Sequence, residues 1–255
     1  MSDPSFQIIP IPGLPMVEPG DDLAELILAA LQDNDMALQS GDIVCVAQKI
    51  VSKAEHQLID LADIEAGEEA IALAAETDKD PRLVQLILDE STEVLRKREG
   101  VLIVRHNLGF VGAHAGIDQS NVDHTGGEKA LLLPKDPDQS AQALKQALEA
   151  QANCQLGIII TDSHNRPWRM GTIGAAIGCA GITVLDDHRG GTDVYGRELK
   201  VTLINRADAL AAAATLGMGE TTEQIPLVII RGLPAEQTEQ TASMINRPLE
   251  EDLFR

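Results

Sequence analysis

Aromatic residues are scarce in this chain: they make up 2% of its 255 residues, with one tryptophan, one tyrosine and three phenylalanines. The core must therefore be built mainly from isoleucine, leucine, valine and alanine, within a hydrophobic fraction of 44% that is ordinary for a soluble globular protein. We expect the lone tryptophan, Trp168, to have a packing role and to be half-buried, in preference to stacking on a substrate.

Basic residues are few as well, with 20 lysines and arginines against 40 acidic residues and a formal net charge of −20. Such a surface repels nucleic acid and anionic membranes, so neither is expected as a partner. We expect no signal peptide, and no apolar run approaches the ~18 residues of a membrane-spanning helix. The three cysteines, Cys45, Cys154 and Cys179, lie in or beside apolar runs without paired spacing. They predict buried thiols of a cytoplasmic protein, not disulfides or a metal site.

Strand-like and helix-like segments alternate, which predicts one large α/β domain or two small ones. Apolar runs predict strands at 6–11, 43–46, 101–104, 157–162, 173–182 and 226–230, and one that begins at 196. Helical spacing and capping residues predict helices at 23–31, 136–150 and 207–216, and two within 62–98. Asp22 is expected to cap the first of these helices, and Asp80 with Pro81 to start the second helix within 62–98. The glycine- and alanine-rich segment 173–182 indicates a tightly packed sheet or a subunit contact.

Two nucleotide-binding signatures are missing, since neither Gly-x-Gly-x-x-Gly nor Gly-x-x-x-x-Gly-Lys-Ser/Thr follows a strand. A bound nucleotide would therefore not lie in a Rossmann or P-loop cradle. The six histidines are scattered, and no Ser/His/Asp arrangement can be assembled from them. Only His114 and His164 lie beside the acidic motifs described next, and a structural or solvent-facing role is the simpler interpretation of both.

Two acidic motifs follow apolar strands. Residues 157–160 lead into Thr161-Asp162-Ser163, and the strand at 101–104 is followed by a glycine-rich stretch that ends near Asp118 and Asn121. Mg²⁺ or Mn²⁺ in a phosphate site commonly takes one or two protein carboxylates, with waters and phosphate oxygens completing its shell. Asp118 and Asp162 at two strand ends would suit such an ion, and an Asx turn at each place is the alternative.

Basic residues gather in one stretch of this acidic chain, where an anionic ligand is expected: Arg166, Arg169, Arg189, Arg197 and Arg206. Earlier, Lys49, Ser52 and Lys53 follow the strand at 43–46. They indicate either a phosphate-facing turn or a helix start with solvated lysines.

Six motifs occur in order along the chain: Gly-Leu-Pro at 13–15, Glu-Pro-Gly-Asp-Asp-Leu at 18–23, Val-Ala-Gln-Lys-Ile-Val-Ser-Lys-Ala-Glu at 46–55, Ala-Gly-Ile-Asp-x-Ser-Asn-Val at 115–122, Thr-Asp with Arg-Pro-Trp-Arg at 161–169, and Tyr-Gly-Arg-Glu-Leu at 195–199. Together they resemble the coenzyme F420-0:γ-glutamyl ligases, which add L-glutamate to a deazaflavin coenzyme. The resemblance runs from about residue 7 to the end of the sequence.

The resemblance implies a mixed α/β (α+β) γ-glutamyl ligase-like fold with mixed sheets in an intertwined homodimer. It implies one domain over 1–255, or two subdomains, without a C-terminal nitroreductase-like domain. The implied substrates are F420-0, L-glutamate and GTP, with two Mg²⁺ or Mn²⁺ ions per site, and K⁺ as a further candidate. Asp118 and Asp162 would hold one metal, and Ser163 and Glu220 the second. The residues implied to contact GTP are Leu14, Pro15, Met16, Val17, Gln48, Lys53, Asn121, Met218, Gly219, Glu220, Thr221, Thr222, Glu223, Gln224 and Ile225.

Three positions depart from the resemblance: Ser163 stands where threonine is frequent, Gln48 where some members have serine, and His114 where asparagine is common. The implied reaction is amide formation through an acyl phosphate, in which the protein mainly positions groups and neutralises charge. The sequence singles out no general base. Two alternatives stay open: a related nucleotide-dependent ligase with another carboxylate acceptor, and a non-catalytic nucleotide- or metal-binding dimer.

Overall fold

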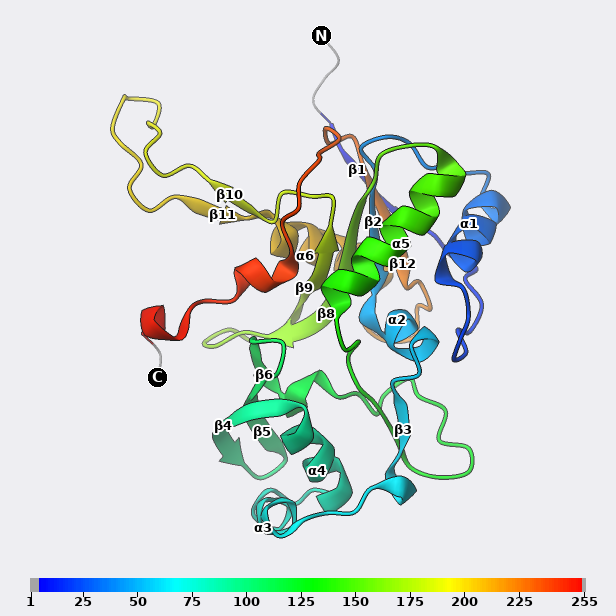
Figure 1. Ribbon diagram of the computed structural model, residues 1–255, viewed down its shortest axis with the longest axis vertical. Helices are drawn as coiled ribbons and strands as arrows, with labels where there is room; N and C mark the ends of the chain where they lie inside the picture. Colours follow the sequence, from blue (N-terminus) through cyan, green and yellow to red (C-terminus); the bar gives the residue numbers. More distant parts are fainter. Residues whose placement is uncertain (1–4, 254–255) are drawn as a thin grey trace.

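The computed structural model describes residues 5–253, which form two lobes (Figure 1). The larger lobe, the main body, contains β1 (Gln7–Pro10), α1 (Leu23–Asp33), β2 (Ile43–Ala47), α2 (Gln48–Ala54), α5 (Pro137–Ala152), β8 (Gly157–Asn165), β9 (Thr172–Ala180), β10 (Leu185–Asp187), β11 (Leu203–Asn205), α6 (Arg206–Met218), β12 (Leu227–Arg231), η3 (Ala242–Ile245) and η4 (Leu249–Glu251). The smaller lobe, here called the subdomain, is inserted at 58–131 and contains β3 (Leu58–Asp60), η1 (Leu61–Asp63), α3 (Glu68–Thr77), α4 (Pro81–Asp89), β4 (Ser91–Arg98), β5 (Val101–His106), β6 (Val111–Ala113), η2 (His114–Gly116) and β7 (Lys129–Leu131).

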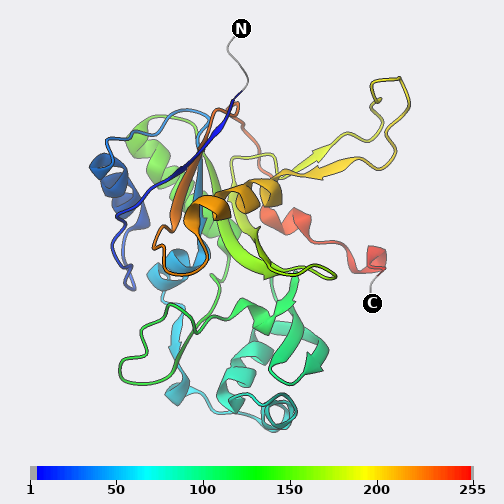
Figure 2. The ribbon, with the colours of Figure 1, turned by 180° about the vertical axis from the view of Figure 1, so that it is seen from behind.

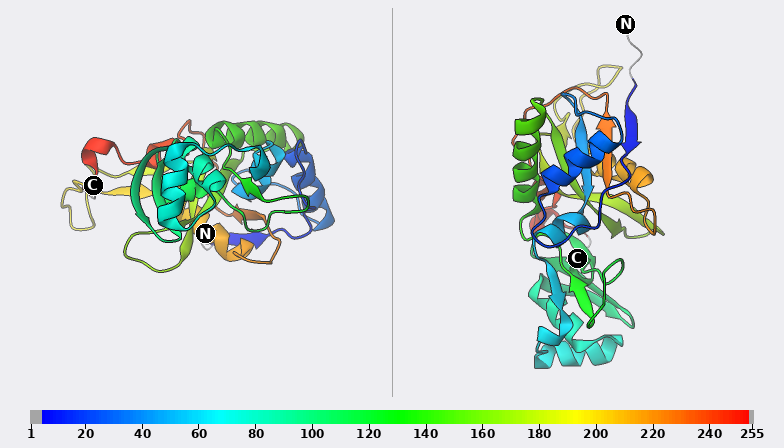
Figure 3. Two further views of the ribbon diagram at one scale, coloured as in Figure 1. Left: turned by 90° about the horizontal axis from the view of Figure 1, so that it is seen from below. Right: turned by 90° about the vertical axis from the view of Figure 1, so that its right-hand side faces the viewer.

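The main body is built on a five-stranded sheet in the order β1-β12-β2-β8-β9. β2 and β8 run parallel, and the other neighbouring strands are antiparallel. The apolar runs of β2, β8 and β12 are buried on both faces of the sheet, which explains why they show no polar alternation. α1, α2 and α5 pack on one face and α6 on the other (Figures 1 and 3). The predicted mixed α/β architecture is confirmed.

β9 carries the small residues for which the sequence left two interpretations open. A Cβ atom on Gly174 would lie 2.5 Å from the carbonyl oxygen of Ala211 in α6, and one on Gly178 would lie 2.2 Å from that of Pro137 in α5. The two helices therefore approach the strand so closely that only glycine fits at these positions. Packing within the chain accounts for the composition of β9, which by itself no longer indicates a subunit contact.

Two expected elements are different in the structure. Residues 91–98 form β4 instead of a helix, because Gly100, with φ +75°, returns the chain so that β4 pairs with β5. Residues 196–202 lie in a loop rather than a strand, because Asp193 Oδ1 accepts the backbone N–H groups of Tyr195 and Arg197 and turns the chain. The remaining expected strands and helices are present, with ends shifted by a few residues.

The prediction for Trp168 is wrong, since its side chain is 84% exposed. It lies in the β8–β9 turn, which extends beyond the helices that cover the sheet (Figure 2). The arm formed by β10, β11 and residues 188–202 also projects from the main body (Figures 1 and 2). Its exposed apolar residues are Val194, Tyr195, Val201, Leu203 and Ile204.

The subdomain has cores of its own, in which α3 and α4 cover the β4-β5-β6 sheet and α4 also packs near β3 and β7. Asp80 caps α4 by accepting the N–H of Arg82, and Pro81 occupies the first turn, as the sequence predicted. Within residues 5–253, no helix has both the length and the apolar character needed to cross a bilayer.

Candidate functional site

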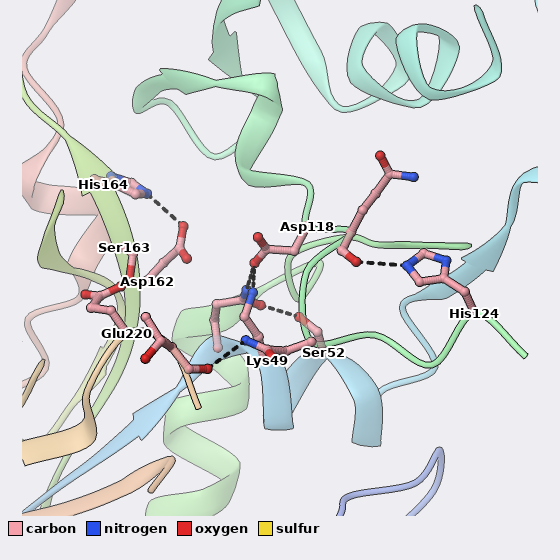
Figure 4. Close-up of polar contacts among 12 residues, drawn as sticks. Lys49, Ser52, Asp118, His124, Asp162, Ser163, His164 and Glu220 are labelled. Atoms are coloured by element: carbon pink, nitrogen blue, oxygen red, sulfur yellow. Dashed lines mark hydrogen bonds and ion pairs between the residues drawn. The ribbon is translucent and has the colours of Figure 1, made fainter. Parts of the chain in front are cut away.

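The candidate site lies where the two parallel strands of the main sheet end. Ala47, the last residue of β2, pairs with Thr161, and within residues 5–253 the rest of β8, to Asn165, pairs with β9 alone. The chain leaves β2 directly into α2, which begins at Gln48. Side chains from β8, α2, the subdomain and the loop after α6 therefore meet at this edge (Figure 4). Ligands of open α/β sheets commonly bind beyond the carboxyl ends of parallel strands.

Alternation along β8 divides its polar residues between the two faces of the sheet. Asp162 and His164 share one face, and Ser163 points to the other (Figure 4). The register shift opposite Thr161 falls on β9, where Ile177 is the extra residue, so the alternation of β8 is unbroken. Asp162 was expected at the end of its strand, but it lies within β8, three residues before Asn165.

Asp118 reaches the site from the subdomain. The preceding residues His114, Ala115 and Gly116 all have positive φ angles, of 55°, 54° and 66°, and make a left-handed turn after β6. Asp118 then forms a β-bridge with Leu131, exchanging two backbone hydrogen bonds. Left-handed conformations are unfavourable for residues other than glycine, so the surrounding fold must hold this turn. The turn aims the Asp118 carboxylate toward the main body.

The first residues of α2 hold the Asp118 carboxylate. Gln48 is 2% exposed, accepts a hydrogen bond from Ser52 Oγ at 2.9 Å, and donates to Asp118 Oδ2 at 3.1 Å. Lys49 forms an ion pair with the same oxygen. Burial raises the pKa of the Asp118 carboxyl above its ordinary value, the Lys49 charge opposes that rise, and the nearby charge of Asp162 adds to it. The two aspartates therefore interact across the lobes.

A second polar pair lies on the other face of β8. Ser163 Oγ donates to Glu220 Oε2 at 2.6 Å, and Asn121 Nδ2 donates to the carbonyl oxygen of Thr221 at 3.3 Å. The loop 219–225 is shaped by Glu223, whose Oε2 accepts the backbone N–H of Thr221 at 2.8 Å. The structure thus brings Asp118, Asn121, Asp162, Ser163 and Glu220 to one region, with the loop that contains Thr221, Thr222, Glu223, Gln224 and Ile225 beside them.

Further expected contact residues lie on the loop before α1 and at the end of α6. Met218 and Gly219 end α6, and the Met218 side chain is buried in the core. Val17 is buried and Leu14 packs on the same core, whereas Pro15 and Met16 are exposed. The loop that carries them runs beside α2, since the N–H of Gly20 donates to the carbonyl oxygen of Ala54. Among the described residues, no hydrogen bond joins residues 14–17 to the carboxylates.

The two lysines of α2 have different surroundings. Lys49 is paired with Asp118, whereas Lys53, in the last turn, has no ion pair with any residue of the described range. The sequence named Lys53 as the contact residue and missed Lys49 as the partner of Asp118. The segment is a helix from Gln48, as one interpretation expected, but Lys49 on it is paired with Asp118 and is not a solvated lysine. Both lysines follow the same buried strand, so sequence spacing alone did not single out Lys49.

The expected arginine cluster is not formed as one group. Arg189 makes a bidentate contact with Asp187 at 2.8 and 2.6 Å, and Arg206 pairs with Glu236 at 2.7 Å. These two guanidinium groups are already neutralised by carboxylates of the same chain. Arg166 and Arg169 lie in the β8–β9 turn and Arg197 lies on the arm, so proximity in the sequence did not predict proximity in space.

The donor set at the site consists of oxygen atoms, which suits a hard divalent cation. Within residues 5–253, no three His, Cys, Asp or Glu side chains are grouped closely enough to hold a metal ion by themselves. The acidic groups instead form a pair, Asp118 with Asp162, and a second set, Ser163 with Glu220, on the other face of β8. Two protein oxygens with phosphate and water oxygens form a normal Mg²⁺ shell, so these residues fit such an ion.

Comparison with known proteins gives a match over most of the chain. Residues 13–232 match the family described as F420-0:Gamma-glutamyl ligase. A protein of Methanothermobacter thermautotrophicus named coenzyme F420:L-glutamate ligase is 43% identical over 98% of this chain and 99% of its own length. A protein of the same name from Methanopyrus kandleri is 42% identical over 99% of this chain and 98% of its own length. One from Archaeoglobus fulgidus is 40% identical over 98% of this chain and 96% of its own length.

Proposed function

Because the chain belongs to the F420-0:gamma-glutamyl ligase family, we propose that it joins L-glutamate to the deazaflavin coenzyme precursor F420-0 through an amide bond. The observation that carries this proposal is the meeting of Gln48, Asp118, Asp162, Ser163 and Glu220 at the carboxyl ends of β2 and β8. These residues fall within the matched range, and their oxygen-rich chemistry suits a metal–phosphate substrate. We place the reaction in the cytoplasm, in keeping with three free cysteines.

The proposed reaction consumes GTP in two steps. A carboxylate oxygen of F420-0 attacks the γ-phosphorus, GDP leaves, and an acyl phosphate forms on the acceptor. The amine nitrogen of glutamate then attacks the acyl carbon, inorganic phosphate leaves, and the amine loses a proton. Such a reaction needs positioning and charge neutralisation more than covalent help from the protein.

The acidic residues have defined places in this proposal. Asp118 and Asp162 would hold one divalent ion, Mg²⁺ or Mn²⁺, and Ser163 with Glu220 would hold a second, while K⁺ is a further candidate ion. When bound, the ions would neutralise phosphate charge. Gln48, which is buried, keeps the Asp118 carboxylate in place by donating a hydrogen bond to it.

Two basic or polar groups would act on the nucleotide. Lys53, which has no ion pair within the described range, supplies a cation for phosphate oxygens. Asn121 fixes the loop of residues 219–225 through Thr221, so that this loop and residues 14–17 can enclose GTP from two sides.

We further propose that the working form is a homodimer. The arm and the β8–β9 turn expose large apolar side chains, including Met170 at 100%, Tyr195 at 93% and Val194 at 92%. Apolar surface of this extent on projecting segments is characteristic of protein–protein interfaces. Light scattering after size-exclusion chromatography, at micromolar concentration, should give a mass near twice 27.3 kDa. A monomer would contradict the proposal.

The decisive experiment incubates the purified chain with F420-0, L-glutamate, GTP and Mn²⁺ and follows products by mass spectrometry. We expect a glutamylated deazaflavin with equal amounts of GDP and phosphate. Binding of GTP without phosphate release would favour a non-catalytic nucleotide-binding dimer. Phosphate release that requires another carboxylate acceptor would favour a related amide ligase, and replacing GTP by ATP tests the choice of nucleotide.

A further inference from the structure

A column of three rings joins the subdomain to the main body beside Asp162. His106 of β5 stacks on Phe110 with centroids 4.9 Å apart and planes inclined by 9°. Phe110 in turn packs against His164 of β8, at 4.7 Å and 43°. Among the phenylalanine, tyrosine and tryptophan residues in 5–253, Phe110 is the one whose side chain is not exposed. In a chain so poor in aromatic residues, this placement is specific.

His164 is the end of the column that meets the candidate site. Its Nε2 atom lies 3.0 Å from Asp162 Oδ2. The Nε2 atom is buried, and no other polar partner for it is present in the described part of the chain. The side chains of His164 and Asp162 are 17% and 9% exposed. A buried imidazole N–H without a partner is costly, so this contact fixes how the two side chains lie together.

The other end of the column is anchored inside the subdomain. His106 is 2% exposed, and its Nδ1 accepts the backbone N–H of Leu108 at 2.8 Å. Burial lowers the pKa of His106 to about 4, so its ring is neutral near pH 7. The column therefore rests on a fixed, neutral imidazole at its subdomain end.

We propose that His164 is a positioning residue for Asp162. Phe110 clamps the imidazole, the imidazole holds one carboxylate oxygen, and the second oxygen of Asp162 is left on the side of Asp118 (Figure 4). Asp118 belongs to the subdomain and Asp162 to the main body, so the column also aligns the two carboxylates. The inference rests on the proposed function, because it assigns Asp162 to a divalent cation. Outer-shell partners of metal-binding groups typically change metal affinity by about 10–100-fold when they are removed.

The test is a titration of the full chain with Mn²⁺ alone, followed by the loss of the paramagnetic resonance signal of free Mn²⁺. His164→Phe keeps a ring against Phe110 and removes the N–H donor, and we expect its Mn²⁺ affinity to fall about 10–100-fold. His164→Gln restores a donor at a similar reach, and we expect an affinity within a few-fold of wild type. Phe110→Leu keeps His164 and Asp162 but removes the ring that packs on His164. We expect its loss of Mn²⁺ affinity to lie between those of the two His164 variants.

A matched control is present on the arm. His188 Nε2 lies 3.1 Å from Asp186 Oδ2, with the same two-residue spacing as His164 and Asp162. His188→Phe should leave Mn²⁺ affinity unchanged. Melting temperatures measured without metal show whether each variant folds. If His164→Phe does not fold, the Mn²⁺ affinities of His164→Gln and Phe110→Leu still test the positioning role, because the first should stay near wild type and the second should fall.

The outcomes separate this inference from the proposed function. If Asp162→Asn abolishes Mn²⁺ binding while His164→Phe binds as wild type, the positioning role is overturned and the metal assignment stands. Equal losses of Mn²⁺ affinity in His164→Phe and His164→Gln would also overturn the positioning role, because restoring a donor at this position would then have no effect. If Mn²⁺ binding does not depend on Asp162, the metal assignment and this inference fail together.

Discussion

Replacement of Asp118 by asparagine separates a metal-binding role from a structural one. The substitution removes one negative charge and keeps the shape of the side chain. In the structure this carboxylate accepts a hydrogen bond from Gln48 and forms an ion pair with Lys49, and its side chain is 29% exposed. Its pKa is raised, mainly by burial, so the folded state already disfavours the charged form. A neutral amide is therefore tolerated without ligand.

The direction in which Asp118→Asn changes the stability of the metal-free protein follows from the raised pKa of Asp118. A carboxyl whose pKa is higher in the folded than in the unfolded state costs stability at neutral pH, and that cost disappears as the pH falls below both pKa values. The Asp118→Asn substitution removes the cost, while Lys49 loses a partly exposed partner worth about 0–1 kcal/mol. The two effects oppose each other, so the net change should stay within about 1 kcal/mol, or about 2–4 °C in melting temperature for a chain of this size.

In the presence of a divalent ion, Asp118→Asn should lower the stability of the protein relative to the wild type. A divalent ion at about 100 times its dissociation constant stabilises the wild type by about 2.7 kcal/mol, whereas Asp118→Asn should gain almost nothing. Scanning calorimetry with and without Mn²⁺, beside the rate of ligation, measures both. Asp123→Asn is a matched control in the same loop, because Asp123 accepts the N–H of Thr125 in an ordinary Asx turn. A large loss of stability without metal, together with undiminished Mn²⁺-dependent ligation, would refute the reasoning.

Three further predictions follow from other features. Lys53→Ala should weaken GTP binding by about 1.5–3 kcal/mol and leave Mn²⁺ binding in place; an unchanged nucleotide dissociation constant in calorimetry would show a merely solvated lysine. Gly174→Ala should lower the unfolding free energy by about 1–3 kcal/mol or more, since its Cβ would lie 2.5 Å from a carbonyl oxygen of α6; wild-type thermal stability would contradict the packing. His106, with a pKa lowered from 6.5 to about 4, contributes stability that is full above pH 6.5 and is lost as the pH falls toward 4; His106→Phe should flatten this part of the stability profile, and an unchanged profile would exclude His106 as its source.

The main sheet could be predicted because its sequence signals are local. The apolar runs at 43–46, 157–160 and 227–230 have no polar alternation, which is typical of strands buried on both faces. The caps Asp22 and Asp80 likewise marked the starts of α1 and α4. In each case the residues that determine the element lie within the element or next to it.

The features that the sequence analysis predicted wrongly or left open depend on contacts between segments that are distant in the sequence. β4 is a strand because β5 offers a partner after the turn at Gly100, and nothing within 91–98 contains that information. The small residues of β9 were compatible with two surfaces, and only the positions of α5 and α6 decide between them. The pairing of Lys49 with Asp118 joins two lobes, so it could not be distinguished from a role for Lys53 by sequence spacing.

The site depends on one local event, the end of β2 at Ala47. The chain turns into α2 at Gln48, so β8 continues beyond its parallel neighbour and presents Asp162 and Ser163 on its two faces. If β2 were longer, its backbone would pair with this edge of β8 and fill the space where the side chains meet. The same helix start also supplies Gln48, which holds Asp118 from the other lobe. The strand end and the acidic residues are therefore parts of one arrangement, in which β8 presents Asp162 and Ser163 directly and the subdomain brings Asp118 to the helix start that holds it.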